Sequence, residues 1–143
     1  MKPTYTFILF FAITACTSSN DKQQQNIATI QNMFDAFNKH QWQTMSEYYI
    51  ERASFLDPSF GKDYVIKTRK QTTDKYAEMQ KLFPDIHDEV IALYPSGDIV
   101  TAEFISTGTL NDSISFKLPI VAVFTLKDGK IIRDATYYDQ ENP

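Results

Sequence analysis

Residues 53–61, Ala-Ser-Phe-Leu-Asp-Pro-Ser-Phe-Gly, decide the fold of this chain. Their composition predicts a short strand over residues 53–57, and Pro58 must end its pairing because proline has no backbone N–H to donate. The proline also biases Asp57 toward an extended backbone, and Gly61 lets the chain turn into the next element. We therefore expect a carboxylate at the end of a strand, on the side where a domain of three helices and a curved sheet opens.

Two predicted helices precede this stretch and a third follows it. Residues 26–39 carry apolar side chains at helical spacing, and a short second helix places Trp42 and its apolar neighbours on one face. Residues 63–83 show the same period and predict the longest helix, which Pro84 ends. On this third helix we expect the charged side chains, Lys75 among them, to face outward.

From residue 86 onward the apolar period changes from helical to alternating. The pattern predicts four strands, over residues 86–94, 99–108, 113–126 and 130–139. Asp128-Gly129 predicts a tight hairpin turn, and Pro119 predicts a sheet edge or a bulge. Helices followed by a meander of strands predict an α+β fold, a cone in which three N-terminal helices pack in a strongly curved, mostly antiparallel sheet.

The first 15 residues have the features of a secretory signal peptide. Lys2 is the only charged residue before position 21, and the apolar run over residues 5–13 is too short to span a bilayer. Ile13-Thr14-Ala15-Cys16 resembles the lipobox of bacterial lipoproteins, which are cut before the cysteine and acylated on it. This resemblance implies a signal peptide over residues 1–15, a flexible tether with lipidated Cys16 over residues 16–25, and a domain over residues 26–143.

The lipobox resemblance also implies a location. A lipid on Cys16 would hold the protein in the bacterial cell envelope, since two or more acyl chains give stable anchoring. Thr17 is not the acidic residue that some bacteria use for inner-membrane retention, so we expect the outer membrane, with the periplasmic or surface face left open. The alternative is an ordinary secreted protein in which the cysteine has no such role.

The composition bears on the kinds of partner. The chain has 14 Lys and Arg against 18 Asp and Glu, and no basic patch, so we expect no nucleic-acid partner. A single cysteine allows neither an internal disulfide nor a cysteine-based metal site. His40, expected at a helix end, and His87, expected on a strand, are too isolated to predict a metal site. No metal and no cofactor is expected.

The order of the elements and four short motifs together resemble the nuclear transport factor 2 superfamily, also called the SnoaL-like or ketosteroid isomerase-like fold. The motifs are Phe34-Asp35-Ala36-Phe37-Asn38, Phe55-Leu56-Asp57-Pro58, Phe83-Pro84-Asp85, and Asp128-Gly129-Lys130-Ile131 leading to Tyr137-Tyr138-Asp139. The resemblance covers residues 26–140 and implies a cone of sheet around a pocket. It also implies a homodimer through the open sheet face, which the apolar stretch 118–123 fits. This fold hosts many enzymes and binders, so it does not determine function.

In ketosteroid isomerase, the carboxylate before the matching proline is the base that moves a proton, and Asp57 occupies that position. That enzyme also needs two oxyanion donors, and the matching positions here are Met33 and Val121, which cannot donate. Steroid isomerisation by that mechanism is therefore not expected. Asp57 remains a candidate general base with its pKa raised by an apolar pocket. The alternative is a turn carboxylate that hydrogen-bonds the loop before the third helix.

Polyketide cyclases of the SnoaL type use a base near the end of the last strand. Alternation puts Asp134 and Tyr138 on one face there, and the resemblance turns that face toward the pocket, with Asp139 at the rim. The choice of a cyclase base among these stays open. The side chains expected to bind a ligand are Trp42, Tyr48, Phe55, Asp134, Tyr138 and Asp139.

Three functions fit these observations, and whether the protein is an enzyme stays open. The first is a membrane-anchored protein that binds a small, mostly apolar or aromatic molecule in its cone without catalysis. It is favoured because no second acid or oxyanion donor is identified. The second is an isomerase- or cyclase-type enzyme that moves a proton next to a carbonyl, with Asp57 as general base. The third is a dimeric interaction module whose pocket is filled by side chains.

Overall fold

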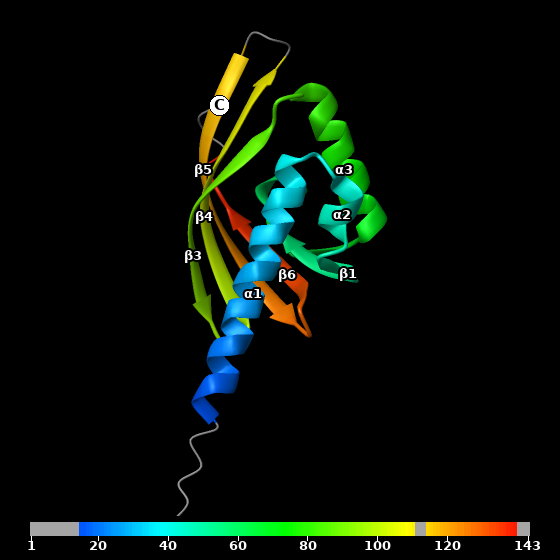
Figure 1. Cartoon of the computed structure of the whole chain (residues 1–143). Coiled ribbons are helices and arrows are strands. Elements are labelled where there is room, and N and C mark those ends of the chain that lie inside the picture. Colours follow the sequence, from blue (N-terminus) through cyan, green and yellow to red (C-terminus); the bar gives the residue numbers. More distant parts are fainter. Residues whose placement is uncertain (1–14, 111–113, 140–143) are drawn as a thin grey trace, which may run out of the picture.

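A six-stranded curved sheet forms one layer of the domain, and three helices pack against its inner face (Figure 1). The computed structural model describes residues 15–110 and 114–139, with side chains from residue 19 onward. The helices are α1 (Ala15–Asn38), α2 (Trp42–Ser46) and α3 (Arg69–Leu82), with a short 3-10 helix, η1 (Pro58–Phe60). The strands are β1 (Tyr49–Leu56), β2 (Val65–Thr68), β3 (His87–Ser96), β4 (Ile99–Leu110), β5 (Ile114–Lys127) and β6 (Lys130–Tyr137).

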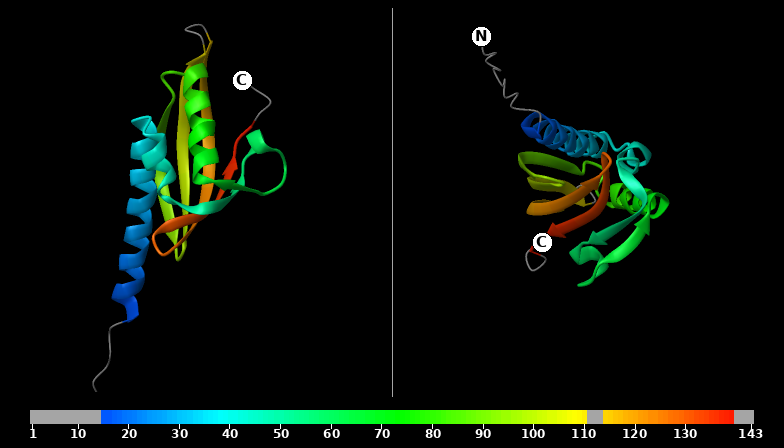
Figure 2. Two further views of the ribbon diagram at one scale, coloured as in Figure 1. Left: turned by 90° about the vertical axis from the view of Figure 1, so that its right-hand side faces the viewer. Right: turned by 90° about the horizontal axis from the view of Figure 1, so that it is seen from below.

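The strands follow the order β2-β1-β6-β5-β4-β3 across the sheet. Only β1 and β6 pair in parallel, and the other neighbours are antiparallel. Figure 2 shows the strands curving around the space that the helices occupy. The predicted α+β plan of three helices in a curved, mostly antiparallel sheet is confirmed, and so are the four C-terminal strands to within a few residues.

The first helix is longer than predicted. Residues 16–25, expected to be a flexible tether, lie within α1, and the segment contains no glycine or proline to interrupt the helix. The Lys22 ammonium lies 2.5 Å from the Asp98 carboxylate, and the Asn26 amide donates to the Gly97 carbonyl at 3.2 Å. Both contacts hold α1 against the β3–β4 turn. The predicted signal peptide before Ala15 and the side chain of Cys16 lie outside what the structure describes.

The predicted helix over residues 63–83 was wrong in its first part. Val65–Thr68 instead form β2, which pairs antiparallel with β1, and the helix begins only at Arg69. Thr68 and Gln71 form a capping box: the Thr68 hydroxyl accepts from the Gln71 N–H, and the Gln71 side chain accepts from the Thr68 N–H. The longest helix is therefore α1.

Two turn and edge predictions hold. Asp128 and Gly129 have φ values of 50° and 74°, which are the two positive values of a type I′ turn between β5 and β6. The pairing of β5 with β6 begins at Val121, so Pro119 lies beyond the end of β6, on a locally free side of β5. A missing N–H is harmless there.

The hydrophobic core lies between the helices and the inner face of the sheet. The Phe34 ring of α1 packs edge-on against Phe104 and Phe124, with ring centroids 4.9 and 6.2 Å apart. Ile30 and Val100 are completely buried. None of the helices in the described part of the chain is long and apolar enough to cross a membrane.

Candidate functional site

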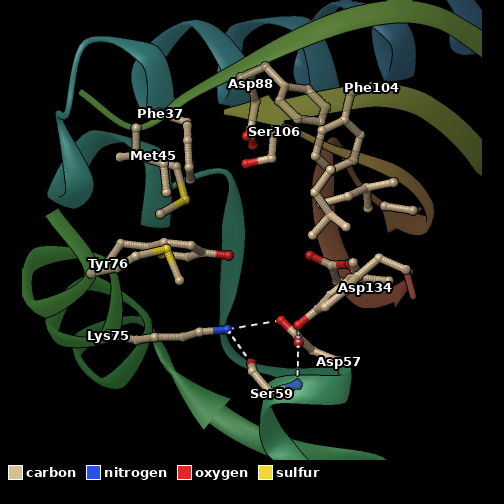
Figure 3. Close-up of a pocket in the computed structure, with 18 of the residues that line it drawn as sticks. Phe37, Met45, Asp57, Ser59, Lys75, Tyr76, Asp88, Phe104, Ser106 and Asp134 are labelled. Atoms are coloured by element: carbon tan, nitrogen blue, oxygen red, sulfur yellow. Dashed lines mark hydrogen bonds and ion pairs between the residues drawn. The ribbon is translucent and has the colours of Figure 1, made fainter. Parts of the chain in front are cut away.

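A pocket of about 230 Å³ lies between α1, α3 and the inner face of the sheet (Figure 3). Most of its wall is apolar, and aromatic rings dominate it: Phe34, Phe37, Phe104, Phe116 and Phe124. Polar side chains form small groups on opposite sides of this apolar space, around Asp57 and Asp134 on one side and around Asp88 on the other. Mostly apolar clefts with a few convergent polar groups are typical ligand sites.

An ion pair and two hydrogen bonds fix the Asp57 carboxylate. One carboxylate oxygen lies 2.9 Å from the Lys75 ammonium, and the other accepts from the Tyr138 hydroxyl at 3.0 Å and from the Ser59 N–H at 2.8 Å. The Ser59 bond makes Asp57 the N-cap of η1, and Pro58 suits the first position of that turn. The interpretation of Asp57 as a turn carboxylate is confirmed.

The electrostatics of Asp57 are the reverse of those predicted. Its burial alone would raise the pKa, but the Lys75 ammonium and the hydrogen bonds of Ser59 outweigh burial and hold the pKa of Asp57 below its usual range. The side chains of Asp57 and Lys75 are only 16% and 19% exposed. A carboxylate so strongly stabilised in its charged form is a poor proton acceptor near neutral pH.

Lys75 does not face outward as predicted. It projects from α3 into the pocket, where its ammonium lies 4.0 Å from the centroid of the Phe60 ring and 3.0 Å from the Ser59 hydroxyl. Lys75, Tyr76, Met79 and Phe83 all line the pocket. Their helical spacing could have placed these residues on one face of the helix. In the sequence alone, however, Lys75 cannot be told from a solvent-exposed lysine, because the position of Asp57 is not known.

Asp134 lies in the same wall and is buried. Its two carboxylate oxygens accept from the Tyr49 hydroxyl at 2.8 Å and from the Thr136 hydroxyl at 2.9 Å. Burial raises the pKa of Asp134 to about 6, against the lowering effect of these two hydrogen bonds. Burial also raises the pKa of Tyr49 well above its usual range, so Tyr49 remains a donor.

A third carboxylate, Asp88, lies across the pocket from Asp57 (Figure 3). It stands on β3 opposite Ser106 of β4, whose hydroxyl favours the charged form of its carboxylate. Asn38 of α1 fixes its backbone, accepting from the Asp88 N–H and donating to the Asp88 carbonyl, both at 2.8 Å. Burial raises the pKa of Asp88 to about 7.

The comparisons with known proteins agree with this geometry. The family model of the SnoaL-like domain matches residues 30–134, most of the chain. The chain belongs to the SnoaL-like family. No curated protein matches it.

Solved structures with a similar fold include a hypothetical protein and two enzymes. A ketosteroid isomerase-like protein from Catenulispora acidiphila, in complex with trimethylamine, has a TM-score of 0.70 at 18% identity, over 78% of this chain and 85% of its own. An LEH-like epoxide hydrolase from M. tuberculosis has 0.70 at 14%, over 82% and 85%. The epoxide hydrolase/cyclase-like enzyme of pyran ring formation in salinomycin has 0.71 at 21%, over 82% and 92%. At these identities the likeness establishes the fold alone.

The pocket of this SnoaL-like domain contains some of the residues singled out in the sequence. Asp57, Asp134 and Tyr138 all line it, and Met33 does as well. Val121 does not: it is 41% exposed on the opposite face of β5. Its neighbours Ile120 and Ala122 line the pocket instead, and neither can donate a hydrogen bond.

Four predicted ligand-binding residues lie outside the pocket lining. Trp42 packs behind the wall, against Phe37 and Tyr76, and donates to Gln80 at 2.7 Å. The other three are Tyr48, half-buried before β1; Phe55, stacked on Tyr49; and Asp139, exposed beyond β6.

Sequence reasoning missed several polar residues of the SnoaL-like pocket. They are Tyr49, Ser59, Lys75, Asp88, Ser106 and Thr136. The sequence did contain a signal for Asp88. It alternates with Ile86 and Val90, the pattern of the buried face of a strand. Across the described ranges, no three His, Cys, Asp or Glu side chains group as a metal site would need.

Proposed function

We propose that this SnoaL-like protein binds a small, mostly apolar molecule in its pocket. The observation that carries the proposal is the open cavity of about 230 Å³, which has aromatic walls and polar groups on two sides. A cavity of this size limits the ligand to a small molecule. The related fold that holds trimethylamine is consistent with this size. A pocket filled by side chains, the third alternative, does not match this cavity.

The ligand need not be identified for the test. A molecule that binds only the folded state raises its stability, so protein isolated from its own host should melt higher than the same protein after unfolding and refolding. We expect a difference of roughly 5 °C or more for a well-occupied site. Ala122→Leu places extra volume in the pocket and should abolish this difference. Val123→Leu, on the other face of β5, should retain it. Equal melting temperatures before and after refolding would argue against a bound ligand.

A second candidate function is proton transfer in the same pocket, and Asp134 supports it better than Asp57. The pKa of Asp134, raised to about 6 by burial, is close to that of an effective general base or acid, whereas the pKa of Asp57 is lowered. If the protein turns over an epoxide or an unsaturated ketone, Asp134→Asn should reduce the rate by roughly two or more orders of magnitude. Turnover that survives in Asp134→Asn would reject this candidate.

We also propose that the protein is a lipoprotein of the bacterial cell envelope, anchored through Cys16. The support is the lipobox-like stretch over residues 13–16 and the apolar run before it. The start of α1 at Ala15 would place a helix directly after such an anchor, and the pocket-lining residues of α1, from Met33 onward, would lie about 25 Å along that helix from Cys16.

The outer face of the sheet supports a proposal of homodimerisation. Val121 and Tyr137 are direct neighbours across β5 and β6, and are 41% and 53% exposed. Apolar side chains grouped on an open sheet face are typical of a contact surface. Light scattering measures the outcome: a mass of two chains is expected, and a monomer at micromolar concentration would contradict it.

A further inference from the structure

Asp88 is a pocket residue with unfilled hydrogen-bonding capacity. Among the described residues, its Oδ1 atom is buried and has no hydrogen-bond partner, and the Ser106 hydroxyl opposite favours the charged carboxylate. Asp88 is only 7% exposed, and it lines the pocket. Buried polar atoms are almost always paired, so a carboxylate with an unpaired oxygen in the wall of a cavity marks a place where a ligand group is missing.

The position of this carboxylate is fixed. Asn38 holds both the N–H and the carbonyl of Asp88, and the cross-strand pairing with Ser106 sets the face to which the side chain points. A site on two paired strands and locked by a helix is rigid, so a ligand group that meets the Asp88 carboxylate meets it without a cost of ordering.

The carboxyl groups that line the pocket outnumber its cations. Asp57, Asp88 and Asp134 line it together with a single ammonium, that of Lys75, which pairs with Asp57 at 2.9 Å. The Asp134 carboxylate accepts hydrogen bonds from two neutral hydroxyl groups. Asp88 has no cation beside it among the residues that line the pocket, and buried charges are normally paired.

Aromatic rings surround the space beside Asp88. Figure 3 shows Phe37 and Phe104 on either side of it, and the Tyr76 hydroxyl points into the same cavity. Ring faces attract cations, most strongly where water is excluded. An ammonium group would therefore find both a carboxylate and aromatic faces here, and an apolar body would fill the remaining wall.

We propose that Asp88 and Ser106 bind the charged end of the ligand, and that the ligand is a small protonated amine with an apolar body. This inference rests on the proposed ligand-binding function and specifies its ligand class. The ammonium donates to the Asp88 carboxylate, and the Ser106 hydroxyl beside it favours the charged form of that carboxylate.

The titration of Asp88 predicts the direction in which amine binding changes with pH. Its pKa is raised to about 7 by burial in the empty pocket, and an ammonium beside it lowers that pKa again. Amine binding should therefore tighten as the pH rises from about 5 to 8. The neighbours facing it from α1 and β4, Asn38 and Ser106, do not titrate in this range.

Other groups facing the pocket contribute little to that step. Burial keeps the Tyr76 hydroxyl of α3 protonated by raising its pKa well above the usual value. Across the cavity, Asp57 and Lys75 stay paired. Burial raises the pKa of Asp134 to about 6, so its titration adds a second step in amine affinity, at a lower pH.

The experiment compares cyclohexylamine, protonated throughout this range, with cyclohexanone, which has the same ring and can only accept a hydrogen bond. Calorimetry or ligand-observed NMR on the purified protein should show the amine binding more tightly than the ketone at pH 8 and weakening toward pH 5. Asp88→Asn should weaken the amine about tenfold or more, as expected for losing one charged hydrogen bond, and remove the pH step near 7. Glu89→Gln makes the same charge change on the exposed face of β3 and should alter neither ligand.

Each other outcome overturns the inference. Equal amine affinity in Asp88→Asn would show that Asp88 does not bind it. Ketone binding that is tighter than amine binding and strengthens at pH 5 would show that Asp88 acts as a protonated donor, so the ligand is not an amine. Binding of neither compound would reject the class. The proposed ligand-binding function is judged separately, by the molecule retained from the host, and survives any of these results if such a molecule is found.

Discussion

The free energy of unfolding is expected to fall by a few kcal/mol as the pH rises from about 4 to 8, because two buried carboxyl groups must ionise in the folded state. Burial raises the pKa of Asp88 to about 7 and that of Asp134 to about 6, from an ordinary value of 3.8. Between those values the folded state binds more protons than the unfolded state. The stability they contribute is therefore complete below about pH 4 and is lost as the pH passes through about 6 and 7.

Asp57 acts in the opposite sense and at lower pH. Burial raises its pKa, but Lys75 and Ser59 outweigh that effect and hold the pKa below the ordinary value. Its contribution to stability is present above the ordinary carboxyl pKa and is lost as the pH falls through the folded-state pKa. The protein should thus be most stable near pH 4 to 5 and lose stability on both sides.

Urea unfolding at pH 5, 6, 7 and 8 measures this profile. Asp88→Asn keeps the shape of the side chain and removes the buried charge, so it should be more stable than the wild type at pH 8 and have a flatter profile. Glu89→Gln on the exposed face should leave the slope unchanged. A flat wild-type profile, or an Asp88→Asn variant that is less stable than the wild type at pH 8, would contradict the claim that ionisation of the buried Asp88 costs stability. A residue that costs stability is typical of a functional site.

Replacement of Cys16 by serine is expected to move the protein from the membrane fraction to the soluble fraction. Each buried CH₂ of an acyl chain contributes about 0.8 kcal/mol to membrane binding, and several chains together anchor a protein stably. Serine cannot carry a thioether-linked lipid, and Cys16 is the only cysteine in the chain. The change should therefore remove the anchor nearly completely.

Cell fractionation and mass spectrometry of the N-terminal peptide check this prediction. The wild-type peptide should begin at Cys16 and carry the mass of its acyl chains, while Thr17→Ser should behave as the wild type. A Cys16→Ser protein that remains with the membranes would show that something other than this lipid holds it there. An unmodified wild-type Cys16 would support the alternative of an ordinary secreted protein.

The sequence predicted most of the sheet because its alternation is regular. The Asp128-Gly129 turn and the strands around it depend on local preferences, and these agree with the structure. β2 was missed because its four residues precede a helix directly and form a strand only by pairing with β1. That pairing is a tertiary contact, which local periodicity cannot show.

The site was partly predictable for the same reason. Asp57, Asp134 and Tyr138 were found because strand alternation and the family resemblance both placed them, and all three line the pocket. The sign of the pKa shift of Asp57 was missed because it depends on Lys75, 18 residues away on a helix whose start was misplaced. Asp88 was visible as an acid in an apolar row, but only its unpaired oxygen and its burial single it out.

Native mass spectrometry of the protein purified gently from its own host tests the central claim most directly. We predict a wild-type species that carries the mass of one small molecule per chain, lost on activation. We also predict an empty Ala122→Leu variant and a loaded Val123→Leu variant. A wild-type protein that is empty, or an Ala122→Leu variant that retains the same mass, would contradict the claim that this pocket holds a small ligand.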